Sequence, residues 1–217
     1  MRNPPSPSSD ARRLRRAFAV ALAFVLLLWG IKLTEVLGGF DLSRFGIYPR
    51  EAGGLAGVLF APLIHGSFSH LFANTTPLVV VGTMLLYGYP RAAKVLLPTV
   101  YIVGGGVVWL FARDAHHIGA SGLAFGMLFF VFTIGALRWE PRAIALSLAV
   151  FFLYGGMIWG VFPSEPGVSF ESHLSAALIG VVLAFVLKRS DPEPPRKQYS
   201  WEREGEEADD YEWPHGL

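Results

Sequence analysis

The chain alternates between long apolar stretches and short polar connections. Each apolar stretch is about 17 to 22 residues long, which is enough for an α-helix to cross the hydrocarbon core of a bilayer. Six stretches are expected to be membrane spans, namely residues 17–37, 68–88, 92–112, 119–137, 143–162 and 171–187. The pattern therefore predicts an all-α membrane protein built as a bundle of six transmembrane helices.

The remaining segments differ in length and character. Residues 38–67 are too long for a tight turn and too interrupted by Gly and Pro for a span, so we expect an interfacial loop with short helical pieces. The other loops are short, as helical hairpins prefer. Residues 1–16 form a basic tail, and residues 189–217 form an acidic tail that we expect to be disordered. The first stretch lacks a small-residue cleavage site, which argues against a signal peptide.

The composition agrees with a membrane protein. Of 217 residues, 53% are hydrophobic and 16% are charged, which is more apolar than the usual soluble domain. The formal net charge of +1 gives no basis for nucleic-acid binding. Because the chain contains no cysteine, disulfide bonds, thiolate metal sites and a cysteine nucleophile are excluded.

The distribution of basic residues predicts the orientation. With the N-terminus in the cytoplasm, fourteen of the 18 Lys and Arg residues lie on the cytoplasmic side. Basic residues near the ends of spans prefer that side. We therefore expect an integral protein of the plasma (inner) membrane with both termini in the cytoplasm. The outer ends of the second, fourth and sixth spans then share one side of the membrane.

Polar side chains occur at these three outer ends. Ser121 opens the fourth span within the tetrapeptide Gly-Ala-Ser-Gly, and His173 lies near the start of the sixth span. His70 and Asn74 lie four residues apart on one face of the second span. Such groups are costly in hydrocarbon unless they face each other or line a polar cavity. Their similar depth favours a hydrolytic site in the plane of the membrane, opening to the outer side.

These residue types suit the steps of serine catalysis. Serine is a weak nucleophile until a base takes its proton, and histidine suits that task near neutral pH, so Ser121 and His173 form a candidate dyad. Free N–H groups at a helix start favour an oxyanion, and His70 and Asn74 would add side-chain donors. No carboxylate lies deep in a span, so we expect a dyad oriented by packing rather than a triad with aspartate.

Small and aromatic neighbours favour the same arrangement. Gly119 and Gly122 belong to a strip of glycines on the fourth span, and small residues continue the face of His173 on the sixth span. Small faces allow membrane helices to approach closely. Phe125, one turn after Ser121, is placed to stack on the imidazole.

Together these motifs resemble those of the rhomboid intramembrane serine proteases. The similarity covers about residues 17–188. It comprises a His-x3-Asn motif at residues 70–74 after an upstream His65, the Gly-Ala-Ser-Gly box, and Ser-Phe-Glu-Ser-His at residues 169–173. The order and spacing of these motifs, together with the six spans, fit that family.

The resemblance implies both an activity and residue roles. A rhomboid-type bundle would cleave transmembrane protein substrates within or near the lipid bilayer. Ser121 would be the nucleophile and His173 the base. His70, Asn74 and the amide of Ser121 would form the oxyanion hole.

Other interpretations use the same residues. A Gly-x-Ser-Gly sequence alone is usually a packing element. A catalytically inactive rhomboid-like protein would bind transmembrane clients, although both dyad residues are present. A small transporter would use buried histidines to relay protons, but the two halves show no inverted repeat. The pair His116 and His117 lacks a His-Glu-x-x-His pattern, so we expect no metal site and no cofactor.

The fifth span is the expected movable wall for entry of water and substrate. Its glycines within residues 155–160 weaken a helix, and its aromatic residues within 151–154 are bulky enough to plug a lateral opening. The alternative is that these aromatic side chains only face lipid.

Overall fold

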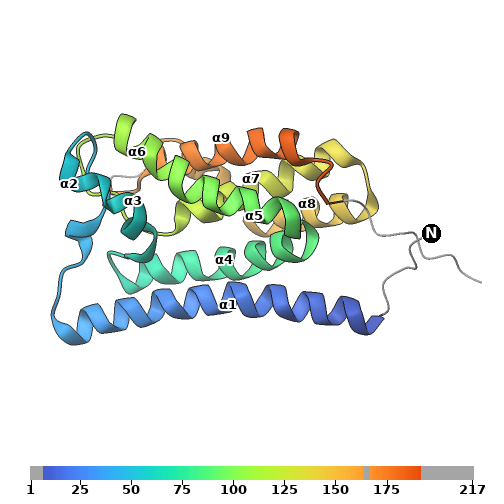
Figure 1. Ribbon diagram of the computed structural model, residues 1–217, viewed down its shortest axis with the longest axis horizontal. Coiled ribbons are helices and arrows are strands. Elements are labelled where there is room, and N and C mark those ends of the chain that lie inside the picture. The colour runs from blue at the N-terminus through green and yellow to red at the C-terminus, as the bar shows by residue number, and fades with distance from the viewer. Residues whose placement is uncertain (1–6, 164–166, 192–217) are drawn as a thin grey trace, which may run out of the picture.

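The computed structural model describes residues 7–163 and 167–191, and this part of the chain is mostly helical (Figure 1). The bundle consists of α1 (Pro7–Gly38), α4 (Phe68–Gly88), α5 (Pro90–Thr99), α6 (Gly105–Phe111), α7 (Ser121–Arg138), α8 (Pro141–Tyr154) and α9 (Phe170–Leu187). The π-helical turn η3 (Val100–Gly104) joins α5 to α6, and the 3-10 helix η4 (Gly155–Val161) continues α8. Within the described residues, six helical segments are long and apolar enough to span a membrane, which confirms the predicted fold.

The helix bounds differ from the expected spans chiefly in the first and fifth spans. α1 begins at Pro7 rather than at Ala17, because the Arg-rich sequence just before Ala17 has high helix propensity and extends the helix beyond its apolar part. The α-helix of the fifth span ends at Tyr154, since the two glycines that follow weaken it. Residues 1–6 and most of the expected acidic tail, residues 192–217, lie outside the described residues.

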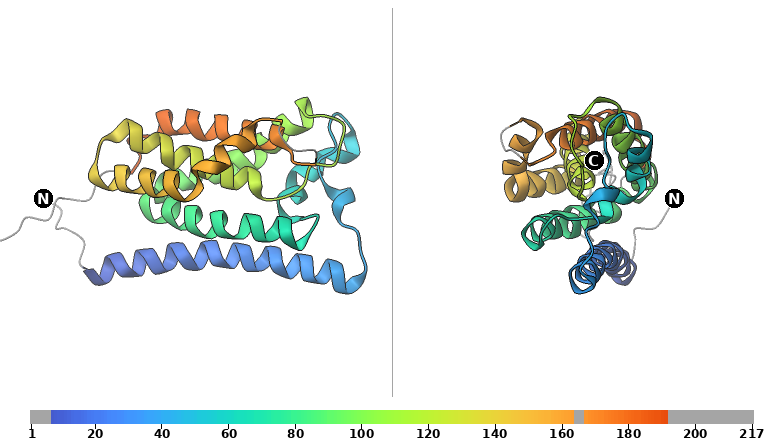
Figure 2. Two further views of the ribbon diagram at one scale, coloured as in Figure 1. Left: turned by 180° about the vertical axis from the view of Figure 1, so that it is seen from behind. Right: turned by 90° about the vertical axis from the view of Figure 1, so that its left-hand side faces the viewer.

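α7 occupies the centre of the bundle. It packs most extensively against α9 and α8, and it also contacts α4 and α5 (Figure 1; Figure 2). α1 lies at the edge and packs chiefly along α4, as the end-on view of Figure 2 also shows. This arrangement brings the starts of α4, α7 and α9 to the same end of the bundle, as their up-and-down connections require.

The contact between α7 and α9 is made by small residues. A Cβ atom on Gly180 of α9 would overlap the carbonyl oxygen of Gly126 on α7. One turn closer to the start of α7, a Cβ atom on Gly122 would lie 3.1 Å from Oγ of Ser172. Helices with such small faces can approach main chain to main chain, which is a common way of packing in membranes.

The segment between α1 and α4 is held to its surroundings by several hydrogen bonds along its length. It contains η1 (Ser43–Phe45), α2 (Ala52–Leu55), α3 (Gly57–Phe60) and η2 (Ala61–Leu63). At its start, buried Glu35 accepts hydrogen bonds from Lys32 at 2.9 Å and from the N–H of Leu42 at 3.1 Å. Further along, Ile47 and His117 exchange main-chain hydrogen bonds of 3.0 and 2.9 Å. The loop is thereby fixed both to α1 and to the connection between α6 and α7.

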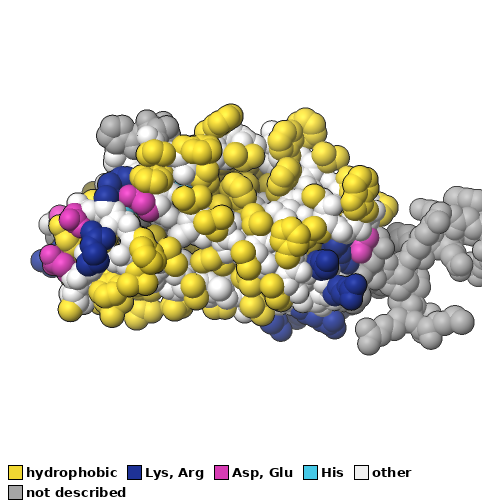
Figure 3. All heavy atoms as spheres, turned by 90° about the horizontal axis from the view of Figure 1, so that it is seen from above, with side chains coloured by type: hydrophobic (Ala, Val, Ile, Leu, Met, Phe, Trp, Pro, Cys, Tyr) yellow, Lys and Arg dark blue, Asp and Glu magenta, His cyan; other side chains and the backbone are white. Residues whose placement is uncertain are grey.

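The outer surface has the polarity expected of a membrane protein. In the face seen in Figure 3, hydrophobic side chains cover the middle, whereas Lys, Arg, Asp and Glu gather toward the two ends. Large apolar side chains that are exposed include those of Val20, Ile102, Phe152 and Val182. A continuous apolar surface of this kind is rare on soluble monomers, so it is explained by contact with lipid.

Candidate active site

The structure brings Ser121 and His173 into contact. Ser121 is the first residue of α7, and His173 lies one turn into α9, whose start is capped by the hydroxyl of Ser169 accepting the N–H of Ser172. The Oγ atom of Ser121 and Nε2 of His173 lie 2.8 Å apart, which is hydrogen-bonding distance. His173 is buried, so this pair is partly shielded from solvent.

The other ring nitrogen of His173 determines which tautomer is present. Nδ1 lies 2.9 Å from the carbonyl oxygen of Gly160. A carbonyl only accepts hydrogen bonds, so Nδ1 carries the proton and Nε2 presents its lone pair to Ser121. The expected dyad without a carboxylate therefore has an orienting partner, and that partner is a main-chain group of η4. Main-chain carbonyls leave no signature in a sequence, which is why sequence analysis missed it.

Phe125 stacks on the imidazole of His173, as expected from its spacing. The ring centroids are 4.0 Å apart and the planes are inclined by 5°. Gly160 lies at the edge of both rings, because a Cβ atom there would lie 2.7 Å from Cζ of Phe125 and 3.3 Å from Nδ1 of His173. The imidazole thus contacts both α7 and η4, and this close approach requires glycine at position 160.

His70 and Asn74 lie beside the turn that precedes Ser121. Gly119 has φ +109°, and a Cβ atom there would lie 2.8 Å from Nε2 of His70 and 3.9 Å from Nδ2 of Asn74. The backbone conformation and the close approach both require glycine at this position. His70, Asn74, Ser121 and His173 all line one open cavity of about 880 Å³. Phe125 lines the same cavity, whereas the predicted supporting residues Gly119 and Gly122 lie outside its lining.

The geometry agrees with a family match along the chain. The family model of the Rhomboid domain matches residues 52–190 of this chain. The chain belongs to the rhomboid family. The matched segment includes all the cavity residues described above, and together with the six apolar helices it identifies this rhomboid protein as an integral membrane protein.

Relatives of this rhomboid protein occur in bacteria and plants. An uncharacterized protein of Mycobacterium tuberculosis is 37% identical over 214 residues, covering 94% of this chain and 87% of the relative. An uncharacterized protein of Mycobacterium leprae is 35% identical over 197 residues, covering 86% and 76%. Rhomboid-like protein 11, chloroplastic, of Arabidopsis thaliana is 30% identical over 145 residues, covering 59% and 51%.

A second contact joins the loops that carry the two dyad residues, and the sequence did not reveal it. Nδ1 of His117 lies 2.6 Å from Oγ of Ser169, and Nε2 lies 3.0 Å from the carbonyl oxygen of Arg113. Because that carbonyl only accepts, Nε2 of His117 carries the proton and Ser169 donates to Nδ1. His117 lies four residues before Ser121, and Ser169 lies four residues before His173. The contact therefore fixes the N-terminal ends of α7 and α9 relative to each other.

An ion pair reinforces the same junction. The guanidinium of Arg113 lies 3.2 Å from both carboxylate oxygens of Glu171 and donates to the carbonyl of Val168 at 2.6 Å. His117 has both ring nitrogens occupied by these neighbours, so it is not available as a metal ligand in this arrangement. Within residues 7–163 and 167–191, no group of three His, Asp or Glu side chains is placed to hold a metal ion.

The fifth span of this rhomboid protein has aromatic residues of two kinds. Phe152 and Trp159 are 78% and 71% exposed, so their side chains face outward rather than filling a gap between helices. Phe151 stacks on Phe132 of α7, with centroids 5.9 Å apart. The lipid-facing alternative therefore describes Phe152 and Trp159, whereas a gating movement of the span stays a prediction.

His65 anchors the turn before α7 as an uncharged acceptor. Its Nε2 atom accepts the N–H of Ala120 at 3.3 Å, and the N–H of Gly119 is bonded to the carbonyl of Ala61 at 2.8 Å. Burial, with a further contribution from nearby His70, lowers the pKa of His65 from 6.5 to about 4. His65 thus stays neutral near pH 7 and positions the residue adjacent to Ser121.

This pKa predicts how stability depends on pH. The unfolded chain binds a proton at His65 below about pH 6.5, whereas the folded chain resists protonation until about pH 4, so stability is lost as the pH falls through this window. Between pH 7 and pH 5 the wild type should lose about 2 kcal/mol more than His65→Gln, whose side-chain oxygen can still accept from Ala120. Unfolding of both proteins in detergent at the two pH values checks this. Equal losses would contradict a buried, neutral His65.

Proposed function

We propose that this protein is an intramembrane serine endopeptidase that cleaves transmembrane protein substrates within or near the bilayer. The observation that carries the proposal is the 2.8 Å contact between Ser121 Oγ and His173 Nε2, in the tautomer that leaves Nε2 unprotonated. Membership of the rhomboid family supports the same reaction class.

In the first half of the reaction, Nε2 of His173 takes the hydroxyl proton as Oγ of Ser121 attacks the scissile carbonyl carbon. The Nδ1–H group keeps its hydrogen bond to the Gly160 carbonyl, so the imidazolium keeps its orientation. The tetrahedral intermediate collapses when His173 returns the proton to the leaving amine, which leaves an acyl-enzyme on Ser121. A water molecule, deprotonated by the same imidazole, then hydrolyses the ester and regenerates the serine.

The oxyanion of the intermediate requires donors on the side of the carbonyl opposite the base. The amide of Ser121 belongs to the first turn of α7, where N–H groups have no partner within the helix. His70 and Asn74 flank the same turn and add side-chain donors. These groups act on charge that develops only after attack, which is the condition for raising turnover.

The proposed setting follows from charge and cavity. The active-site cavity lies at one end of the bundle, and α1 starts at the other end. The side chains of Arg12, Arg13, Arg15 and Arg16 gather at the start of α1. We infer that this arginine-rich end faces the cytoplasm, that the membrane is the plasma (inner) membrane, and that the cavity receives water from the outer side. A transmembrane substrate would reach it laterally from the bilayer.

Loss of either dyad residue should abolish cleavage. Ser121→Ala and His173→Ala each remove nucleophile activation, which is typically worth several orders of magnitude in rate. Purified proteins are compared for cleavage of a transmembrane substrate and for labelling by a fluorophosphonate probe. Ser175→Ala is a matched control, because its hydroxyl bonds only to the carbonyl of Ser172 on the same helix and should be dispensable. Retained cleavage by Ser121→Ala would refute the proposal, and an unlabelled wild type would indicate an inactive client-binding protein.

The oxyanion assignment predicts a specific kinetic defect. Asn74→Ala should lower kcat at least about 30-fold, or roughly 2 kcal/mol, with little change in KM, because the lost donor acts mainly in the transition state. Thr83→Ala is a suitable control: it removes a hydroxyl that bonds to Val79 on the same helix, away from the cavity. Steady-state cleavage assays measure both constants. A rise in KM with unchanged kcat would assign Asn74 to substrate binding instead.

The orientation can be tested on this naturally cysteine-free chain. Ala11→Cys, on the exposed basic part of α1, should resist a membrane-impermeant thiol reagent in intact cells. Ala52→Cys, exposed at the start of α2, should react with it. Permeabilised cells provide the control, since both cysteines should then react. The reverse pattern in intact cells would place the cavity on the cytoplasmic side.

A further inference from the structure

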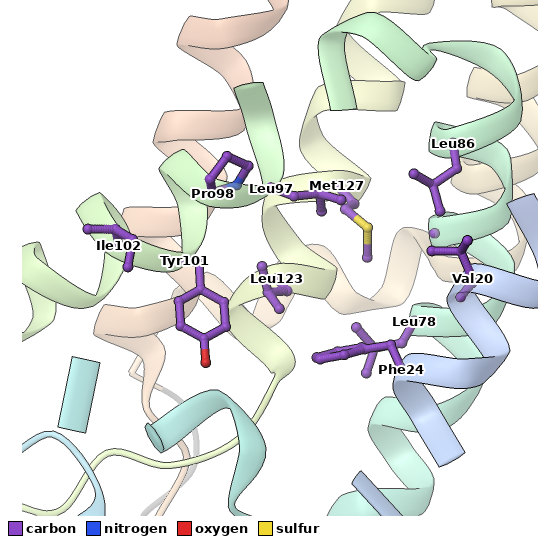
Figure 4. Close-up of a pocket in the computed structure, with 12 residues that line it drawn as sticks. Val20, Phe24, Leu78, Leu86, Leu97, Pro98, Tyr101, Ile102, Leu123 and Met127 are labelled. Atoms are coloured by element: carbon purple, nitrogen blue, oxygen red, sulfur yellow. The ribbon is translucent and has the colours of Figure 1, made fainter. Parts of the chain in front are cut away.

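A second cavity lies on the opposite face of the bundle core from α9. It has a volume of about 450 Å³ and is lined by side chains from α1, α4, α5 with η3, and α7 (Figure 4). Phe24 comes from α1, Leu78 from α4, Tyr101 from η3, and Leu123 and Met127 from α7. None of the proposed catalytic residues belongs to its lining, so it is separate from the active-site cavity.

The walls of this cavity suit hydrocarbon and not water. Among its lining side chains only Tyr101 carries an oxygen or nitrogen atom, and that hydroxyl donates to the carbonyl of Leu59 at 2.5 Å. A cavity without polar partners does not hold ordered water. If the cavity were empty, the atoms that line it would lack dispersion contacts on that side. An apolar chain is therefore the occupant that this volume accepts.

The cavity has a lateral opening toward the lipid. Val20 on α1 and Ile102 on η3 both contribute to its lining and remain 59% and 47% exposed. α1 packs chiefly on α4, so α1 and α5 are not sealed against each other by extensive contact. Pro98, inside α5, cannot donate a main-chain hydrogen bond, and the wide π-helical turn η3 follows it. An acyl chain of the bilayer has direct access between these helices.

Two basic side chains mark one end of this opening. Arg16 lies four residues before Val20 on α1, and Lys94 lies four residues before Pro98 on α5, so each continues a face that lines the cavity. Both helices start at the same end of the bundle, toward which helical side chains lean. Both residues are exposed, and within the described part of the chain neither makes a hydrogen bond or an ion pair. They place two positive charges at the end of the bundle where α1 and α5 begin.

We propose that this cavity binds one anionic phospholipid, with its phosphate between Arg16 and Lys94 and one acyl chain between α1 and α5. The lipid would bridge α1 to the rest of the bundle, to which α1 is otherwise joined chiefly through α4. This proposal does not depend on the proposed protease activity. Its energetic basis is the attraction of two cations for an anionic headgroup together with burial of the acyl chain.

Native mass spectrometry of the purified full chain tests this proposal. The protein is incubated with phosphatidylglycerol or with phosphatidylcholine of identical acyl chains, and the bound fraction is titrated. The wild type should retain one phosphatidylglycerol in preference to phosphatidylcholine. Arg16→Gln and Lys94→Gln should each lower that affinity about fivefold, corresponding to one lost charge near the headgroup. Arg15→Gln is the matched control, because it removes the same charge from a position about 100° around α1 from Arg16, farther from the face of Val20 and Phe24.

Two further measurements separate the acyl chain from the headgroup. Gly82→Leu should weaken binding of both lipids by filling the cavity, since a Cβ atom at Gly82 points at Ala21 and Met127. If that variant does not fold, dihexanoyl phosphatidylglycerol serves instead: it keeps the headgroup, has chains too short to fill the cavity, and should bind more weakly than the long-chain lipid. Equal retention of the two headgroups, equal effects of Arg15→Gln and Arg16→Gln, or equal binding of short and long chains would each overturn the proposal.

Discussion

The separation between α7 and α9 determines whether Ser121 and His173 can meet. At Gly126 and Gly180 the two helices approach so closely that a side chain on Gly180 would collide with a carbonyl oxygen. Close-packed interiors tolerate little change at such a contact, so the helices are held at one spacing. The 2.8 Å contact between the serine and the imidazole is built on that spacing.

The loops at the end of the bundle that carries Ser121 add constraints that helix packing alone does not supply. His65 holds the turn before α7 through Ala120, and His117 joins that same loop to Ser169 at the start of α9. Both histidines act through hydrogen bonds. His65 accepts one as a neutral group, and His117 is bonded through both of its ring nitrogens. The buried pair of Lys32 and Glu35 extends this support to the end of α1.

Sequence analysis predicted those features that depend on side-chain type. Apolar stretches of membrane length marked the six helices, and Ser121, His173 and Asn74 stood out because polar groups are rare in such stretches. The Gly160 carbonyl was not predictable, because every residue has one and only the fold shows which carbonyl meets the imidazole. The early start of α1 was missed for another reason: hydropathy locates the membrane-spanning part of a helix and not the polar turns that prolong it.

The location of Gly160 links two properties that are usually considered separately. Its carbonyl selects the tautomer of His173, yet it belongs to η4, at the C-terminal end of the least buried of the six spans. A displacement of η4 large enough to admit a polypeptide would withdraw that carbonyl and free the imidazole to rotate or change tautomer. The ability of His173 to act as a base would then depend on the fifth span returning to its closed position. Substrate entry and peptide-bond cleavage would therefore require two successive positions of η4.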